Sequence, residues 1–143
     1  MASDVGMIPS RLAGVVWPDL WPLIEPAWRR SREKEDLLAA LAARRLQLWA
    51  IYEGGVPVAA VVTRLNRHAG PNGALDCRIW LVGGRSLAHW LSAFLDKLIP
   101  WARAEGCACL SGAGRKGWTR IAQRLGCVRE GEEDGDTVWR LDL

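Results

Sequence analysis

Four basic side chains follow a glycine-rich turn in the second half of the chain. Gly112-Ala113-Gly114 precedes a helix predicted over residues 115–125, and no acidic residue lies between Glu105 and Glu130. If the helix begins at that turn, its first N–H groups and the nearest basic side chains converge, which is how a helix N-terminus holds phosphate or carboxylate. We therefore expect a face that binds an anion or a partner, made of Arg115, Lys116, Arg120 and Arg124. The alternative is a face that is only solvated.

Three other side chains have chemistry that a catalyst could use. His89 could act as a base beside the double glycine Gly83-Gly84, but a lone histidine on the polar side of a helix is more often solvated. Ser111 and Cys109 fall at the end of a predicted strand without a histidine nearby in sequence, so packing or turn formation is their expected role. The catalytic residues therefore stay unassigned.

The cysteines indicate a reduced protein without a metal site. They form no CxxC pair, and two of them lie two apart on a predicted strand, where they share a face and are badly placed to pair. We expect all four to act as small hydrophobic residues of the core. They are Cys77, Cys107, Cys109 and Cys127.

A continuous stretch from Leu75 to Cys127 supplies the elements that position these residues. It predicts a strand over 75–82, a helix from Leu87, a short strand over 107–111 and the helix over 115–125. The order strand, helix, strand, helix with short links is typical of a crossover between neighbouring strands.

The helix from Leu87 carries one apolar stripe. Its large apolar residues recur at the i, i+3, i+4, i+7 spacing of a half-buried helix. They are Leu87, Trp90, Leu91, Phe94, Leu95, Leu98 and Ile99. We expect Pro100 to bend this helix, because proline lacks a backbone donor, and Gly106 to end it.

The rest of the chain predicts two more helices, a hairpin and a closing pair of strands. Pro18, Pro22 and Pro26 recur every fourth residue, so the first helix should be kinked or restarted. Gly54-Gly55 between two β-rich runs predicts a hairpin turn. The predicted elements are a helix within 15–31 that ends in Arg29-Arg30, a helix over 35–45, and strands over 46–53, 56–65, 128–130 and 137–143.

Composition limits the class of protein. The 143 residues are half hydrophobic, enough for one domain over 1–143, with residues 1–14 as a loosely held leader and the start of an edge strand near Met7. The net charge of +3 (19 basic minus 16 acidic) argues against nucleic acid and the membrane surface. No signal-like segment or membrane-length apolar run is present, so we expect a cytoplasmic location.

The order of elements resembles the GNAT family of N-acetyltransferases. That resemblance implies a single-domain α+β (α/β) fold with a mixed, mainly antiparallel sheet and helices on both faces. Finer similarity to small GNAT-like proteins of tailed bacteriophages and prophages rests on Gln47-Leu48-Trp49, Gly83-Gly84-Arg85, Trp90, the segment from Trp101 to Cys107 and that from Gly114 to Arg120.

The resemblance also implies a coenzyme site. GNAT enzymes bind the pyrophosphate of acetyl-CoA with a Gln/Arg-x-x-Gly-x-Gly/Ala turn, which here corresponds to Leu81, Val82, Gly83, Gly84, Arg85 and Ser86. Trp80 and Leu81 stand where the Gln or Arg belongs, and Ala122 stands where the family has its tyrosine acid. We therefore expect weak acetyl-CoA binding at most.

Three functions follow as alternatives. The first is a catalytically silent interaction module of the virion or of phage assembly, which binds phage structural proteins or itself. Nine tryptophans favour it, because tryptophan is enriched at interfaces. The second is an N-acyltransferase that moves an acetyl group from acetyl-CoA to an amine. The third is nucleic-acid or anion binding, which the charge disfavours.

Overall fold

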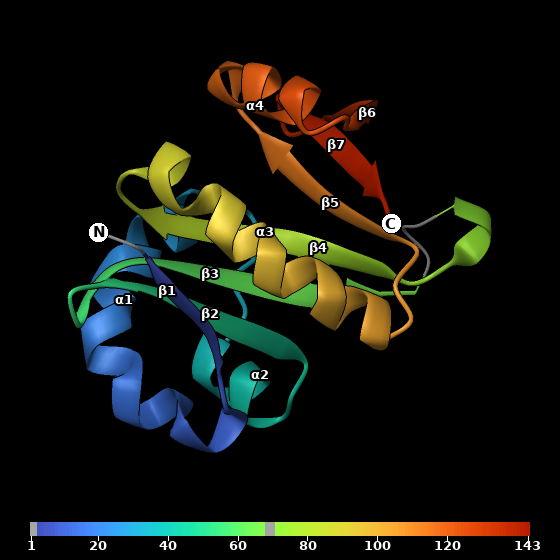
Figure 1. Cartoon of the computed structure of the whole chain (residues 1–143). Helices are drawn as coiled ribbons and strands as arrows, with labels where there is room; N and C mark the ends of the chain where they lie inside the picture. The colour runs from blue at the N-terminus through green and yellow to red at the C-terminus, as the bar shows by residue number, and fades with distance from the viewer. Residues whose placement is uncertain (1–2, 68–70) are drawn as a thin grey trace. The chain divides into compact units, whose positions relative to one another are not determined.

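The computed structural model describes residues 3–67 and 71–143, and it divides into two compact units. The first unit comprises residues up to Arg64 together with Leu81–Pro100. The second comprises Leu65–Trp80 and Trp101–Leu143. Each unit is described by itself below, and Figure 1 shows the elements of both.

Seven strands pair in the order β1-β2-β3-β4-β5-β7-β6. Their bounds are β1 Asp4–Ile8, β2 Leu46–Glu53, β3 Val56–Asn66, β4 Asp76–Gly84, β5 Cys109–Gly114, β6 Val128–Glu133 and β7 Asp136–Asp142. The pairs β1–β2, β2–β3, β5–β7 and β6–β7 are antiparallel, and β4–β5 is parallel. The predicted mixed, mainly antiparallel sheet is therefore confirmed.

Four α-helices and three short 3-10 helices complete the described chain. The α-helices are α1 Ala13–Arg30, α2 Leu37–Ala42, α3 Leu87–Ala104 and α4 Thr119–Arg124, and the 3-10 helices are η1 Ser10–Leu12, η2 Pro71–Gly73 and η3 Lys116–Trp118. None of the helices described is long and apolar enough to cross a membrane.

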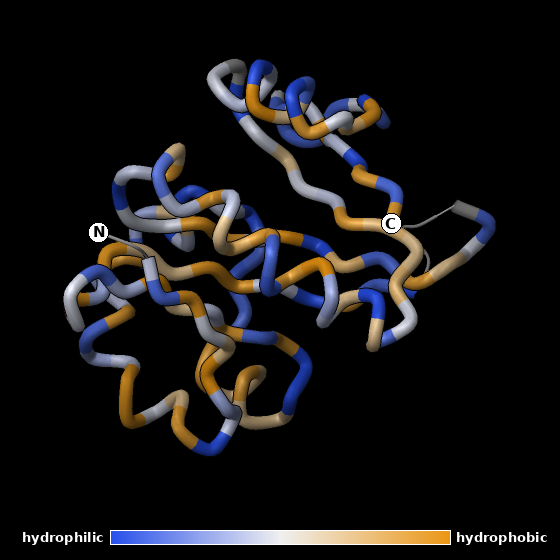
Figure 2. The backbone as a smooth tube through the Cα atoms, in the orientation of Figure 1, coloured by the Kyte–Doolittle hydropathy of each residue, from blue (hydrophilic) through white to orange (hydrophobic). Residues whose placement is uncertain are grey.

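The core of the first unit lies on both faces of β2 and β3. Side chains alternate across a strand, so Trp49 and Leu48 point to opposite faces. The Trp49 ring meets Phe94 of α3 edge-on, with ring centroids 5.7 Å apart. Figure 1 shows α1 and α2 across the strands from α3, and Figure 2 shows hydrophobic residues recurring along these elements. The two helical layers thus bury opposite faces of the same strands.

Helix α1 runs through all three of its prolines. Pro18, Pro22 and Pro26 are spaced by four residues and all are exposed, while Leu20 and Ile24 are fully buried. The donors that proline removes are therefore lost on the solvent side, where water can bond to the carbonyl oxygens. The predicted restart is wrong for this reason, whereas the predicted end at Arg30 is confirmed.

The N-terminal segment contains the edge strand that was predicted near Met7. Residues Asp4–Ile8 form this strand, β1, paired with β2 from Asp4 and Tyr52 to Ile8 and Leu48.

Helix α2 is shorter than the predicted 35–45. It begins after Asp36, which caps it by accepting a bond from the Ala39 N–H at 3.1 Å. It ends before Arg44, whose φ of 62° is not helical.

The second unit pairs four strands in the order β4-β5-β7-β6. The parallel ladder joins Asp76 to Cys109 and ends with Ile79 opposite Gly112. Strand β5 continues through the glycines that were predicted to turn, because they pair with Thr137–Trp139 of β7. Helix α4 then spans only Thr119–Arg124, where a helix over 115–125 was predicted.

Helix α3 offers the clearest test of the core. Trp90 and Phe94 are 1 % exposed and lie edge to face, with ring centroids 6.0 Å apart. Trp90→Ala and Phe94→Ala should each lower the free energy of unfolding by about 3 to 5 kcal/mol, the usual effect of truncating a buried aromatic side chain. Urea denaturation measures this loss. A loss below about 1 kcal/mol would show that these rings do not support the core.

Candidate coenzyme turn and polar cluster

The turn between β4 and α3 depends on two glycines that pack against other elements. A Cβ at Gly83 would lie 1.7 Å from the Leu23 carbonyl oxygen of α1. One at Gly84 would lie 2.3 Å from the Val58 oxygen of β3, and Gly84 has φ +115°, in the region that side chains resist. Only glycine fits both positions, so α1, β3 and β4 approach closely at this point.

Hydrogen bonds then fix the two residues, Arg85 and Ser86, that lead into α3. The Arg85 N–H donates to the Val58 oxygen at 3.2 Å, and the Arg85 oxygen accepts from the buried Trp90 indole at 2.9 Å. Ser86 has φ 61°, which is uncommon outside glycine, and its oxygen accepts from the His89 N–H at 2.8 Å. The position of the first turn of α3 is therefore fixed by hydrogen bonds to Val58 of β3 and to the buried Trp90.

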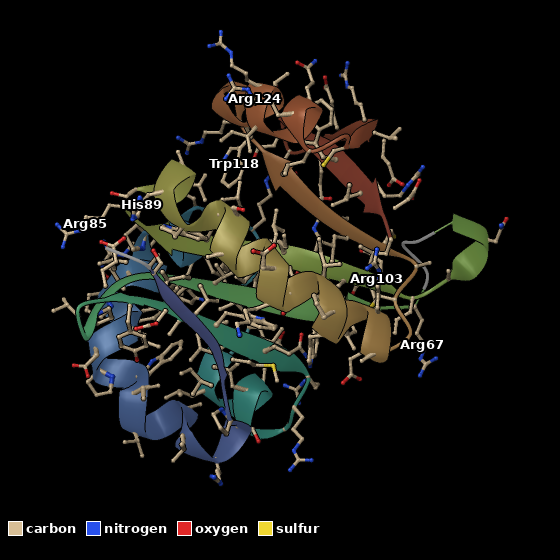
Figure 3. The ribbon with its side chains drawn as sticks, in the orientation of Figure 1. Arg67, Arg85, His89, Arg103, Trp118 and Arg124 are labelled. Carbon is tan, nitrogen blue, oxygen red and sulfur yellow. The ribbon has the colours of Figure 1, made fainter. Side chains whose placement is uncertain are left out.

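This geometry leaves donors available at the start of α3. The first N–H groups of a helix have no intrahelical acceptor, and here Leu87 and Ala88 occupy those positions. Figure 3 shows Arg85 and His89 beside this end of the helix. Two amides and one guanidinium, with the positive end of the helix dipole, can hold an anionic group. Of the predicted coenzyme residues, Leu81 is buried, and Gly84, Arg85 and Ser86 are exposed.

His89 has a carboxylate partner that the sequence did not indicate. Its Nε2 lies 3.5 Å from Glu53 Oε1 at the end of β2, and Ser3 Oγ donates to the same oxygen at 3.4 Å. The His89 side chain remains 54 % exposed, as expected for a solvated histidine. The pair lies far apart in sequence, so only the fold brings it together beside the turn.

The helix that was predicted over 115–125 begins later in the structure. Helix α4 begins at Thr119 after a 3-10 turn, and the Trp118 side chain packs on Gly114, whose added Cβ would lie 2.7 Å from it. Arg115, Arg120 and Arg124 are exposed, the last two one helical turn apart. The Lys116 side chain lies outside the part of the structure that is described. What α4 presents is a basic side-chain face.

A buried carboxylate joins β4 to β5 in the second unit. Asp76 is fully buried, and its two oxygens accept from Ser111 Oγ at 2.5 Å and from Cys109 Sγ at 3.3 Å. Burial raises the pKa of Asp76, while the two hydrogen bonds and Arg78 oppose that rise. Burial and the bond to Asp76 raise the pKa of Cys109 to about 12, so its thiol stays protonated. The cluster links the two strands, and its thiol is not activated for nucleophilic attack.

The cysteines are otherwise as predicted. Cys77, Cys107 and Cys109 are buried, and Cys127 is partly buried. Within the described residues no group of three or more His, Cys, Asp or Glu side chains is placed to hold a metal ion.

Comparisons with known proteins identify the fold. No family model matches the chain, and no curated protein matches its sequence. Among solved structures, the Staphylococcus aureus Mu50 N-acetyltransferase has a TM-score of 0.72 at 12% identity, over 99% of this chain and 98% of that one. The chain has a GNAT-like fold.

Two further structures share the fold of this GNAT-like chain. The GNAT-family acetyltransferase of Streptococcus pneumoniae has a TM-score of 0.66 at 15% identity, over 99% of this chain and 100% of that one. The PaiA N-acetyltransferase of Thermoplasma acidophilum, crystallised with coenzyme A, has a TM-score of 0.68 at 8% identity, over the whole of both chains. Coenzyme A is thus bound by a protein of this fold.

The position that the GNAT resemblance gives to a tyrosine acid holds no acidic group here. Ala122 lies on α4 and is 6 % exposed, with its carbonyl oxygen bonded to the Cys127 N–H at 2.9 Å. An alanine cannot give a proton to a departing thiolate. A GNAT-like mechanism in this chain would need its acid from elsewhere.

Asp76 makes stability depend on pH in a defined direction. Because its pKa is raised in the folded state, folding is favoured when the group is protonated, and this contribution is lost as pH rises through the folded pKa. Asp76→Asn removes the ionisation. The difference in unfolding free energy, variant minus wild type, should therefore increase from pH 4 toward pH 7.

Urea denaturation across that pH range measures the difference. Asp96→Asn, which changes an exposed aspartate on α3, provides the control and should track the wild type. A variant-minus-wild-type difference for Asp76→Asn that stays flat with pH would show that the buried carboxyl is not perturbed.

Proposed function

We propose that this GNAT-like chain is an interaction module that binds coenzyme A weakly and lacks the chemistry of acyl transfer. The observation that carries the proposal is the contrast between two positions. The turn from Gly83 to Ala88 offers amides and a guanidinium to an anion, whereas Ala122 offers no proton to a leaving thiolate. The chain therefore keeps groups that can bind an anion but lacks the catalytic acid.

The expected affinity follows from the number of donors. A full pyrophosphate cradle uses several backbone amides, but here the Arg85 amide is already bonded to Val58 and the His89 amide to Ser86. The donors that remain for the coenzyme are the amides of Leu87 and Ala88 and the guanidinium of Arg85. We expect a dissociation constant for acetyl-CoA of about 0.1 mM or weaker, equivalent to about −5.5 kcal/mol.

The resemblance to phage proteins suggests the partners and the location of the interaction module. The proposed partners are structural or assembly proteins of a tailed phage, or a second copy of the chain, in the bacterial cytoplasm or the virion. The tryptophans support an interaction role, because only Trp49 and Trp90 are buried and the other seven are partly exposed. Finding the chain in purified particles by mass spectrometry would support this setting, and finding it only in host cytosol without particle proteins would contradict it.

An acetyl-CoA-dependent N-acyltransferase acting on an amine is the second candidate. The observation that favours it is the His89–Glu53 pair beside the turn, since a histidine oriented by a carboxylate is a common general base. The candidate requires amine-dependent release of coenzyme A thiol from acetyl-CoA. Turnover that His89→Gln abolishes without loss of acetyl-CoA binding would establish the enzyme and overturn the silent module.

The coenzyme site itself can be tested by titration. Acetyl-CoA should shift the amide NMR signals of Leu87 and Ala88, because these N–H groups would face the phosphates. Arg85→Gln should weaken binding roughly three- to tenfold, the effect of one exposed charge-assisted hydrogen bond. Arg103→Gln removes an exposed arginine from the other end of α3 and should leave the affinity unchanged.

Two results would contradict this assignment. Shifts confined to residues outside the turn would place the coenzyme elsewhere. A micromolar dissociation constant would show that the turn holds the pyrophosphate more completely than two amides and one arginine allow.

A further inference from the structure

The arginines on the strands of the second unit differ in their partners from those in and just before α4. Those on β4, β6 and β7 meet carboxylates: Arg78 with Glu133 at 3.0 Å, Arg129 with Glu132 at 2.9 Å, and Arg140 with Glu130 at 2.5 Å. Arg115, Arg120 and Arg124 are exposed and meet no carboxylate in the described part of the chain. The local charge of α4 is therefore not neutralised within the unit.

Two exposed aliphatic side chains lie close to these arginines in sequence. Leu125 directly follows Arg124 and is 40 % exposed, and Val128, at the start of β6, is 47 % exposed. Ala122 is the buried residue of the helix instead. We call this set of exposed basic and aliphatic side chains the α4 face: Arg115, Arg120, Arg124, Leu125 and Val128.

The α4 face is presented by a fixed scaffold. The Trp118 side chain packs on Gly114, and the Cys127 N–H donates to the Ala122 oxygen at 2.9 Å. The Leu125 N–H donates to the Ile121 oxygen at 3.1 Å. Because these bonds join backbone groups, the exposed side chains can change without loss of the fold. Figure 3 shows Arg124 at the outer end of this element.

We propose that the α4 face docks an acidic, amphipathic segment of another protein. Carboxylates of the segment would pair with the three arginines, and its apolar side chains would cover Leu125 and Val128. Arginine with apolar groups is the composition of protein interfaces. A nucleic-acid backbone would leave the two aliphatic side chains uncovered, and the whole chain carries a charge of only +3. The inference rests on the proposed interaction role and names its partner class, but it does not depend on coenzyme binding.

Fluorescence anisotropy with three labelled probes tests the inference. The first is a synthetic peptide with glutamate and leucine at helical spacing, the second replaces each leucine by serine, and the third is a single-stranded oligonucleotide. The glutamate–leucine peptide should bind at least tenfold more tightly than the other two. Arg120→Gln with Arg124→Gln, and Leu125→Ser alone, should each weaken that binding about tenfold. The urea midpoint should not change, because the altered side chains are exposed.

Arg103→Gln is the matched control, an exposed arginine on α3 that should leave peptide binding unchanged. Equal binding of the serine peptide or the oligonucleotide, lost as salt rises, would show a general polyanion site and overturn the inference. Binding of the glutamate–leucine peptide that survives both variants would place the site elsewhere and also overturn it. Absence of peptide binding would refute this surface alone, whereas acetyl-CoA turnover would refute the silent module.

Discussion

The close approach of three backbones at Gly83 and Gly84 is the constraint on which the first unit depends. Gly83 lies against the Leu23 carbonyl of α1, and Gly84 against Val58 and Ala59 of β3. No side chain can occupy either position without moving a backbone, because the added Cβ would lie well inside contact distance. The two glycines thus allow helix α1 and strand β3 to approach the end of β4 at the same point.

The same contact decides where α3 begins. Because Gly84 packs against β3, the Arg85 N–H can donate to the Val58 oxygen and the Trp90 indole can donate to the Arg85 oxygen. The buried aromatic side chains of α3 then pack on β2. The turn is shaped first by packing, and the amides of Leu87 and Ala88 are those that this packing leaves unbonded. This explains why a GNAT-like fold can persist in a chain that keeps few donors for a coenzyme.

Sequence patterns predicted the elements whose signals are local. The hairpin around Gly54-Gly55, the apolar stripe of α3 and its end at Gly106 all follow from short-range periodicity and turn chemistry. Strand β5 was misplaced because its glycines pair with β7, a contact between distant segments. A restart of helix α1 was predicted wrongly, because its three prolines all lie on the solvent-exposed side of a continuous helix.

The same distinction between local signals and tertiary contacts applies to the candidate site. The glycine turn could be found from sequence, because two adjacent glycines before a helix have a physical meaning there. The pairs His89–Glu53 and Asp76–Ser111 could not, since each joins residues about 35 positions apart through tertiary contact. Arg115, Arg120 and Arg124 are exposed, but α4 begins later than predicted, after the segment in which Trp118 packs on Gly114.

The central claim is that backbone contact at Gly83 holds the first unit together, and urea denaturation of Gly83→Ala tests it most directly. We predict a loss of at least about 2 kcal/mol of unfolding free energy, because the added methyl group must displace α1. Gly14→Ala is the matched control, since Gly14 lies on α1 with nothing within 4 Å of an added Cβ. It should be neutral or stabilise by up to about 1 kcal/mol. Equal stability of the two variants would contradict the account.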